Sequence, residues 1–588
     1  MNTEQKIQNL EAAISHILSG LGIQKPLVVI DKPSDFEFGD VVCNVAMRYS
    51  KELGKPPMEL AEFITEALKE SELSYLEKTE IATPGFINVT FSAEFYRDLI
   101  KEILSLGNNY GKNDDLAGQK WVIEHTSPNP NKAMHLGHLR NNLVGMGLVR
   151  LLKANGAEVI SDAIDNNRGI AIAKLMWGYL SLMRKDQSTE ISIDKWIEDK
   201  TAWYTPEEKS MLPDVFVTEC YVHAGEEIKK DQSVEGIIRE MVVQWEAGDK
   251  KVHELWSFVL TYAYEGMERT LNRLGSYWDN VWHEHEHYQE GKSYVELGLE
   301  KGIFKKLEDG AVLTDLEEKY GIPDTILLKK DGTSLYITQD IALTAKKRDK
   351  FSADRLLWVI GPEQSLAMKQ LFAVCEQLGI GEVSDYSHVS YGYVGLKDDD
   401  GGFKKMSSRA GTVLLIDDLI DTVKEKIKAQ AKVSDVDNSE QLAIGAVKFS
   451  LLKADRTQEI VFDPDQSVEI SGASGIYVMY TYARILSVLS KGENVSDSFS
   501  ADLTTGGDLR KILMFYPEII KRSQKDLSVH HIAQYLLDLS SAFNSWYGNE
   551  TLVDGSEKEA YRLALAKAVA VTIKNGLEIL GIETLDRV

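Results

Sequence analysis

The stretch WVIEHTSPNPNKAMHLGHLRNNLVGMGLVRLLKANGAEVISDAI, residues 121–164, decides the fold. It begins as a short apolar strand, passes through a polar loop into a helix with one apolar face and a glycine stop, and ends in a second strand. This βαβ order predicts a parallel, Rossmann-like sheet. Two later segments, LLWVIG at 356–361 and HVSYGYVGL at 388–396, add further strand signals to it.

The sequence on either side of this stretch differs from it in hydrophobic periodicity and in composition. Residues 1 to about 110 alternate helical and short β patterns, and a Gly-, Asn- and Asp-rich linker follows at 107–119. A charged region at about 180–280 keeps a helical period and is expected to form an insertion, and the chain after Lys448 is almost wholly helical. We therefore expect three domains: an N-terminal α+β domain (1–110), a Rossmann-like α/β domain with a parallel sheet (111–450) and an all-α helix bundle (451–588).

Composition narrows the class of protein. The 588 residues include 43% hydrophobic and 27% charged side chains, which is typical of a globular chain. The net charge of −25 excludes nucleic-acid binding through overall charge, although a local basic groove remains open. Three scattered cysteines without a C-x-x-C pair argue against a zinc knuckle and favour a reducing compartment. With no signal peptide or apolar span predicted, we expect a cytoplasmic protein with no membrane partner.

The loop between the first strand and the helix of the 121–164 stretch is suited to binding phosphate. It lies where a parallel strand leads into a helix, and the helix N-terminus offers unpaired N–H groups and partial positive charge. His135 and His138 could donate to phosphate oxygens, and Gly137 would let a flat base approach the backbone. The alternatives are a capping or core histidine pair, or half of a metal site.

A second loop, GGFKKMSSRAGTVLLIDDL at 401–419, carries glycines, a lysine pair, serines and an arginine before a strand-to-helix segment. Such a polar, cationic loop could fold over a triphosphate. The alternative is a solvated basic loop, the commoner origin of a short Lys/Arg cluster. The order of the two loops, with the histidine loop early and the lysine loop last in the nucleotide fold, favours the first interpretation.

Together the two loops resemble a known pair of signatures. HLGH at 135–138 resembles the HIGH signature of class I aminoacyl-tRNA synthetases, and KMSSR at 405–409 resembles their KMSKS signature. EHTSPN at 124–129, DGTSLYITQD at 331–340 and IGPEQ at 360–364 narrow the resemblance to the arginyl-tRNA synthetase family. The helical segment from FDPD at 462–465 to YVMYTYAR at 477–484 is similar to that family's anticodon-binding domain.

This resemblance implies an arginine–tRNA ligase. Such an enzyme joins L-arginine to ATP, releases pyrophosphate, and transfers the arginyl group to the 3′-terminal ribose of its tRNA for protein synthesis. The resemblance implies ATP with Mg²⁺, no structural zinc, and a monomer whose partners are arginine, ATP and tRNA. Family members typically need bound tRNA before they activate the amino acid.

The resemblance also implies the site residues. For ATP these are His135, Gly137, His138, Lys405, Met406, Ser407 and Ser408. For arginine they are Glu124, Ser127, Asn129, His138, Tyr336, Asp340 and Gln364. A guanidinium group is best met by carboxylates, which makes Asp340 and Glu124 the principal candidates. The alternative for Asp340 is a helix N-cap.

Recognition of tRNA is expected on two surfaces. Tyr477, Tyr480 and Arg484 could stack on or pair with unstacked anticodon bases, although tyrosines at this helical spacing could equally be core residues. In the N-terminal domain, which contacts the tRNA elbow in this family, Phe86 and Asn88 match the family position loosely.

One departure from the family pattern concerns the second lysine of the KMSKS signature, which is replaced here by Ser408. Lys132, three residues before His135, is our hypothesis for the missing cation; the alternative is a solvated loop lysine. The expected catalytic residues are therefore His135, His138, Lys405 and Lys132.

Three alternating histidines, His283, His285 and His287, raise a competing possibility, since on one strand they would share a face and could hold a metal. Three other functions also stay open at this point. They are a different HxGH nucleotidylyltransferase, a different class I synthetase, and a tRNA-binding paralogue without chemistry.

Overall fold

A five-stranded parallel sheet lies at the centre of the computed structural model, which describes residues 2–186, 191–397, 403–404, 414–430, 438–470, 472–492 and 499–587. The strand order is β12-β11-β5-β6-β7, so the order reverses between β5 and β11. The predicted Rossmann-like sheet is confirmed. Its strands are β5 (Lys120–Glu124), β6 (Glu158–Asp165), β7 (Asn280–His283), β11 (Arg355–Val359) and β12 (Tyr386–Val389).

Alternate residues of the sheet face two different cores. In β5, Val122 packs into a core built with the helices of one face, whereas Ile123 packs into a larger core on the side of α5. Because both faces of the sheet are buried in this way, the sequences of its strands are nearly continuous apolar runs. The elements around this sheet are α5 (Leu136–Ala154), α11 (Glu284–His287), α12 (Gly291–Glu300), β8 (Lys305–Lys306), β9 (Val312–Leu313), α13 (Glu317–Tyr320), β10 (Ile326–Leu328), α14 (Tyr336–Phe351), η4 (Pro362–Gln364), α15 (Ser365–Leu378) and η5 (Val383–Asp385).

The segment expected to be one strand at 388–396 is divided. Its first part belongs to β12, but its second part forms β13 (Val394–Lys397), which pairs with β14 (Phe403–Lys404) and β15 (Ile460–Phe462) in a separate sheet. The Gly392 amide donates to the carbonyl of Arg456, so the chain turns away from the main sheet at this glycine.

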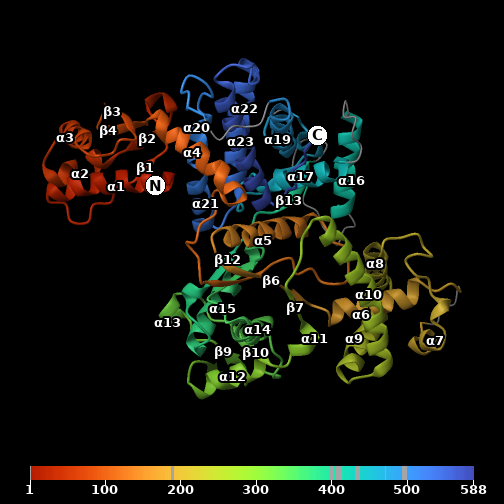
Figure 1. Cartoon of the computed structure of the whole chain (residues 1–588). Coiled ribbons are helices and arrows are strands. Elements are labelled where there is room, and N and C mark those ends of the chain that lie inside the picture. Colours follow the sequence, from red (N-terminus) through yellow and green to blue (C-terminus); the bar gives the residue numbers. More distant parts are fainter. Residues whose placement is uncertain are drawn as a thin grey trace.

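The crossover from β6 to β7 is helical and has its own core, as the periodicity predicts. Trp196, Phe216 and Leu255 are among its fully buried side chains. Figure 1 shows these helices as a lobe to one side of the sheet. They are α6 (Ile170–Leu182), α7 (Ile193–Glu198), η3 (Lys200–Ala202), α8 (Pro213–Lys230), α9 (Ser233–Glu246) and α10 (Lys250–Arg273).

The N-terminal unit combines helices with a small sheet of order β1-β2-β4-β3, in which neighbouring strands are antiparallel. Figure 1 shows it beside α20 and α21 of the bundle. Its elements are α1 (Thr3–Gly20), β1 (Ile30–Asp31), η1 (Phe36–Phe38), β2 (Val41–Cys43), α2 (Val45–Leu53), α3 (Pro57–Lys69), β3 (Leu76–Ala82), β4 (Phe86–Phe91), α4 (Ala93–Leu106) and η2 (Gly107–Asn109).

The segment predicted as a linker is packed against the bundle. The Tyr110 hydroxyl donates to the Leu513 carbonyl over 2.6 Å, and the Tyr110 ring lies 5.6 Å from that of Tyr516. The Asn575 side chain donates to the carbonyls of Gly107 and Tyr110. Composition predicted a linker but could not reveal this packing, because glycine and asparagine are also common in tightly packed turns.

The C-terminal part of the chain is a helix bundle, as expected. Its helices share one continuous core with α5 and the N-terminal unit. None of the described helices is long and apolar enough to cross a membrane. The elements are α16 (Ile416–Gln430), α17 (Ser439–Leu452), α18 (Pro464–Ser467), α19 (Gly475–Leu489), α20 (Leu509–Met514), α21 (Tyr516–Lys525), α22 (His530–Asn549) and α23 (Glu559–Ile579).

Candidate active site

The HLGH loop, residues 135–138, forms the N-terminus of α5 beyond the carboxyl end of β5. His135 is the N-cap residue, and its Nδ1 atom accepts a 3.2 Å hydrogen bond from the Gly137 amide. In return the His135 amide donates to Nδ1 of His138 over 3.2 Å, and the ring centroids lie 3.8 Å apart. The histidines do cap the helix, and this capping fixes the orientation of both rings.

Both rings are neutral at neutral pH. Burial, together with the nearby charge of Lys132, lowers the pKa of His135 to about 4, and burial holds the pKa of His138 well below its ordinary value. Because Nδ1 of each ring accepts a hydrogen bond, the single proton of each neutral ring is on Nε2. Each ring therefore keeps an N–H group that can donate to a phosphate oxygen.

Gly137 lies between these two histidines in the sequence. A Cβ atom added there would lie 3.1 Å from Cε1 and 3.2 Å from Nδ1 of His135, which is tighter than ordinary contact. Any side chain would therefore displace the ring, so the glycine protects the capping geometry as well as keeping the backbone accessible.

Lys132 brings an unpaired positive charge to this loop. Burial lowers the pKa of its ammonium below the ordinary value. No carboxylate of the described chain pairs with it, whereas its charge acts on both His135 and His138. A partly desolvated, unpaired cation is what an incoming anion would meet first.

The first residue of α16 and a residue just before this helix form backbone hydrogen bonds with the same loop. The Leu136 amide donates to the Leu414 carbonyl over 3.2 Å, and the Ile416 amide donates to the Met134 carbonyl over 3.1 Å. The predicted ATP residues of the second signature lie outside the described residues; they are Lys405, Met406, Ser407 and Ser408.

The opposite side of the strand ends is acidic. Glu124 of β5 and Asp162 of β6 share one buried ammonium: Lys347 of α14 donates to Glu124 and lies 2.7 Å from Asp162. Only 1% of the Lys347 side chain is exposed. Burial opposes its charge, but the two carboxylates outweigh burial and raise the pKa of Lys347, so it stays protonated.

Asp340 is the acid of this group that lacks a partner. Within the described chain its carboxylate makes no hydrogen bond or ion pair, and it keeps a partly exposed edge. Burial of its inner side, with Glu124 and Glu284 nearby, raises its pKa to about 7 although Lys347 opposes the shift. A cationic ligand would therefore find here a carboxylate whose charge it could compensate.

The helix-cap interpretation of Asp340 is wrong. Helix α14 begins at Tyr336 and its N-cap residue is Leu335, so Asp340 lies in the second turn. Tyr336 and Asp340 share the helix as the spacing suggested, but the Tyr336 ring is 84% exposed. Lys347 was not identified from the sequence, although it lies seven residues after Asp340, two turns along one helix face.

The remaining predicted arginine residues lie near the same edge of the sheet. Ser127 follows β5, and its Oγ accepts a 3.0 Å hydrogen bond from the Ile164 amide. Asn129 is exposed, and its Oδ1 accepts from Asn166 over 3.1 Å. Gln364 is exposed in η4, just after β11. Since β5 and β11 flank the point where the strand order reverses, these residues surround the usual ligand position of such sheets.

An arginine on the bundle is held between two aromatic rings. The Arg484 guanidinium lies 4.8 Å from the Tyr480 ring centroid and 5.4 Å from that of Tyr547, and it donates to Oδ1 of Asn544 over 2.5 Å. Tyr547 of α22 was not predicted, because only packing of α22 beside α19 brings it there. Tyr477 is partly buried against the core, in line with the core alternative for that residue.

The two candidates in the N-terminal unit differ in exposure. Both lie on β4, where Phe86 is half-buried and Asn88 is buried at 8% exposure. Asn88 pairs in register with Val42 on one side and Glu80 on the other, so its position is the interior of the small sheet.

The three histidines near β7 do not share a strand face. His283 ends β7, while His285 and His287 belong to α11. His283 contacts Asp165 through Nδ1 at 2.7 Å, and His285 contacts Asn167. Because His285 and His287 lie in a helix, the three rings do not form the shared strand face on which the metal alternative was based.

Family models cover most of the chain. Residues 99–464 match the catalytic domain of class I tRNA synthetases of the arginine type. Residues 478–588 match the DALR anticodon binding domain, and residues 8–91 match the arginyl tRNA synthetase N-terminal domain.

Curated relatives and solved structures agree with these matches. The arginine–tRNA ligase of Porphyromonas gingivalis is 31% identical over 628 aligned positions, covering 100% of both chains. That of Treponema denticola is 32% identical and covers 95% of this chain and 94% of the relative. The Thermus thermophilus arginyl-tRNA synthetase structure superposes with a TM-score of 0.78 at 20% identity, covering 99% of this chain and 100% of that one. The Plasmodium falciparum arginyl-tRNA synthetase gives 0.76 at 20% identity, covering 99% of each chain.

Proposed function

The chain belongs to the arginyl-tRNA synthetase family, and from this membership we propose how its residues divide the reaction. The activity is that of an arginine–tRNA ligase: L-arginine and ATP give arginyl-adenylate and pyrophosphate, and the arginyl group then passes to the 3′-terminal ribose of the tRNA. Arginine, ATP and tRNA are its substrates, and an anticodon-binding domain completes the chain.

The guanidinium group of arginine binds on the acidic side of the strand ends. Asp340 pairs with it directly, while Lys347 forms ion pairs with Glu124 and Asp162 and so orients them. The unpaired carboxylate of Asp340 is the observation that carries this assignment. Further contacts come from the other predicted residues, Ser127, Asn129, His138, Tyr336 and Gln364.

The triphosphate binds on the HLGH side. The arginine carboxylate oxygen attacks the α-phosphorus in line, a new P–O bond forms, and the bond to pyrophosphate breaks. The Nε2–H groups of His135 and His138 and the ammonium of Lys132 donate to oxygens on which negative charge develops, and Lys405 adds a second cation. Catalysis then rests on positioning and charge, because no covalent bond to the enzyme is needed.

Mg²⁺ enters with the nucleotide in this proposal. Bound with the phosphates, it would screen their negative charge. A structural zinc is not part of the proposal, since Cys43, Cys220 and Cys375 are buried in three different elements.

The transfer step uses the bundle to hold the tRNA. Arg484, Tyr480 and Tyr547 present a cation between two rings, a combination suited to stacking on unpaired bases. Tyr477 and, in the N-terminal unit, Phe86 and Asn88 are additional contacts in this proposal. The division into domains at 1–110, 111–450 and 451–588, the monomeric state and a cytoplasmic location complete it, the location because translation consumes the product.

ATP–pyrophosphate exchange tests the assignment of the catalytic site. Exchange is expected with arginine alone among the amino acids, and only when tRNA is present. The Asp340→Asn variant should lose arginine affinity while ATP affinity is kept. Loss of both affinities to the same degree would remove Asp340 from the guanidinium site.

A separate experiment tests the bundle surface. Arg484→Ala should weaken the tRNA affinity by about tenfold, the scale of one stacked contact, with unchanged arginine and ATP affinities. The control is Arg522→Ala, an exposed arginine of the same bundle that lies 3.8 Å from Asp526. Equal losses in the two variants would mean that Arg484 contributes only general positive charge.

A further inference from the structure

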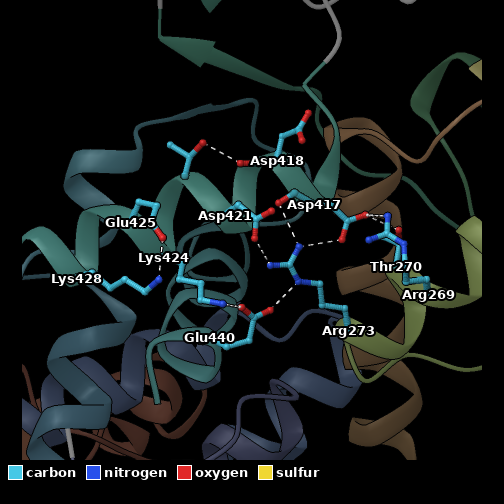
Figure 2. A network of polar contacts seen from close by, with 11 residues as sticks. Arg269, Thr270, Arg273, Asp417, Asp418, Asp421, Lys424, Glu425, Lys428 and Glu440 are labelled. Atoms are coloured by element: carbon cyan, nitrogen blue, oxygen red, sulfur yellow. Dashed lines mark hydrogen bonds and ion pairs between the residues drawn. The ribbon is translucent and has the colours of Figure 1, made fainter. Parts of the chain in front are cut away.

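An ion network joins α10 to α16 and α17, two consecutive helices that lie far from α10 in sequence (Figure 2). Arg273, the last residue of α10, contacts three acidic side chains at once. Its Nε lies 2.6 Å from Glu440 of α17, its Nη1 2.9 Å from Asp417 of α16, and its Nη2 2.5 Å from Asp421. Nη1 also donates to the backbone carbonyl of Asp417 over 3.2 Å. Arg273 therefore connects the helical insertion to α16 and α17.

Asp417 is the best-buried acid of this network. Its side chain is 8% exposed, and its second oxygen, Oδ2, accepts from the Thr270 hydroxyl over 2.7 Å and from Arg269 over 2.8 Å. Both of these donors also belong to α10. Both carboxylate oxygens of Asp417 are thus held by one helix, which fixes the start of α16 in position and in rotation.

The charges of the network support one another. Burial opposes the charge of Arg273, but the surrounding carboxylates raise its pKa above the ordinary value. Burial likewise opposes the charge of Glu440, yet hydrogen bonds from Arg273 and Lys424 hold its pKa below the ordinary value. Removing Arg273 would leave three carboxylates close together without its positive charge. A neutral side chain at position 273 could therefore not replace this contact.

The start of α16 is also the segment that holds the HLGH loop. Asp417 is the second residue of α16, and Ile416 before it donates its amide to the Met134 carbonyl. Two residues earlier, the Leu414 carbonyl accepts from the Leu136 amide, directly next to His135. A shift of α16 would therefore move the backbone that sets the cap geometry of His135.

We propose that Arg273 and Asp417 are positioning residues for arginine activation. They lock the first turn of α16 to the helical insertion, and through Leu414 and Ile416 they keep His135 and His138 in place for the phosphates. The carboxylates proposed for the guanidinium group are held by Lys347 of α14, a helix that packs in a different core, so they do not depend on this network.

Arg273→Met tests the proposal in the full-length enzyme with arginine, ATP and tRNA. The kcat of ATP–pyrophosphate exchange is expected to fall by about 10²-fold, the effect of a displacement near 1 Å, while the KM for arginine stays within about twofold. Hydrogen–deuterium exchange at the amides of Leu136 and Ile416 should become faster. The matched control is Arg239→Met, an arginine of the same insertion in an exposed pair with Glu235, which should leave all three measurements unchanged.

Two further variants keep the test decisive if Arg273→Met folds poorly. Arg273→Lys retains a cation that reaches fewer of the three acids, and Asp417→Asn retains the shape of the carboxylate; each should reduce kcat by about tenfold without unfolding the protein. The double variant Arg273→Met with Asp417→Asn should be no slower than the worse single variant, because both act through one contact. A normal kcat in Arg273→Lys and Asp417→Asn, multiplicative losses in the double variant, or unchanged exchange at Leu136 would overturn the proposal.

Discussion

At the ends of the parallel strands, the acidic side and the HLGH side of the candidate site differ in the sign of their unpaired charge. On the acidic side, Lys347 forms ion pairs with both Glu124 and Asp162, whereas Asp340 has no ion pair within the part of the chain that the structure describes. On the HLGH side, His135 is held neutral and the ammonium of Lys132 has no carboxylate partner among the residues that the structure describes. Each side thus holds a charged group without an ion-pair partner among the described residues, and that charge is opposite in sign to the ligand group it would receive. The comparison shows how a site can be prepared for a charged ligand: one charged side chain has no ion-pair partner in the protein until the ligand binds.

The largest expected effect comes from removing the internal compensation of the acidic side. Lys347→Met would leave Glu124 and Asp162 buried without a cation, which should lower the free energy of unfolding by about 3–5 kcal/mol. Chemical denaturation measures it. The control is Lys346→Met, whose half-exposed pair with Glu290 should contribute no more than about 1 kcal/mol. Equal losses in both variants would mean that the acidic side is not internally compensated, and the comparison would fail.

The second effect concerns the cation of the HLGH side. Lys132→Ala should lower the rate of arginine activation by roughly 10²–10³-fold, the size seen for loss of one transition-state donor. ATP affinity should fall much less, because the contact strengthens as charge develops. Single-turnover kinetics measure the rate, and adding Ser408→Lys to the variant should recover part of it.

A matched control for Lys132 is Lys120→Ala, at the other end of β5, where the ammonium pairs with Glu158 at 3.1 Å. That variant should activate arginine normally. A Lys132→Ala enzyme with a normal activation rate would show that the uncompensated ammonium is a solvated loop lysine.

The third effect is on arginine binding itself. Asp340→Asn should weaken arginine binding by about 10²-fold at pH 8, because a guanidinium would lose its only unshared carboxylate. Calorimetric titration measures the affinity, and Asp349→Asn on the exposed face of the same helix is the control. An unchanged affinity would mean that the acidic side binds arginine through Glu124 instead.

The smallest effect is a pH dependence that sharpens the comparison. Since the pKa of Asp340 is about 7 in the arginine-free protein, arginine binding must pay for its deprotonation below pH 7. The affinity should therefore increase by about tenfold between pH 6 and pH 8, and Asp340→Asn should abolish that increase.

The same shift acts on stability in the opposite sense. The folded pKa of about 7 exceeds the ordinary value of 3.8, so the arginine-free protein should lose stability as pH rises from about 4 to 7, and arginine should restore it. Thermal unfolding with and without arginine checks the sign. A loss of the same size in the Asp340→Asn variant would assign the pH dependence to another group.

Most of the fold could be predicted from the sequence, and so could the position of His135 and His138 at the start of a helix. The βαβ stretch, the helical insertion and the bundle follow local periodicity, and His135 and His138 follow from their place before a helix. Lys347 was missed because its partners come from two strands that meet only in the folded sheet. Asp340 was open to a cap interpretation because the start of α14 is set by the preceding turn. Arg273 reads as an ordinary surface arginine until α16 and α17 are packed beside it.

The packed linker bears on how the chain could be recombined with its relatives. Gly111 lies so close to Tyr516 that an added Cβ would come within 2.4 Å of the ring, and Asn575 bonds the backbone on both sides of the turn. A chimaera with its crossover inside residues 107–119 would set one parent's linker against the other parent's bundle. A chimaera that takes the N-terminal unit, the linker and the bundle from one parent would preserve the contacts between the linker and the bundle.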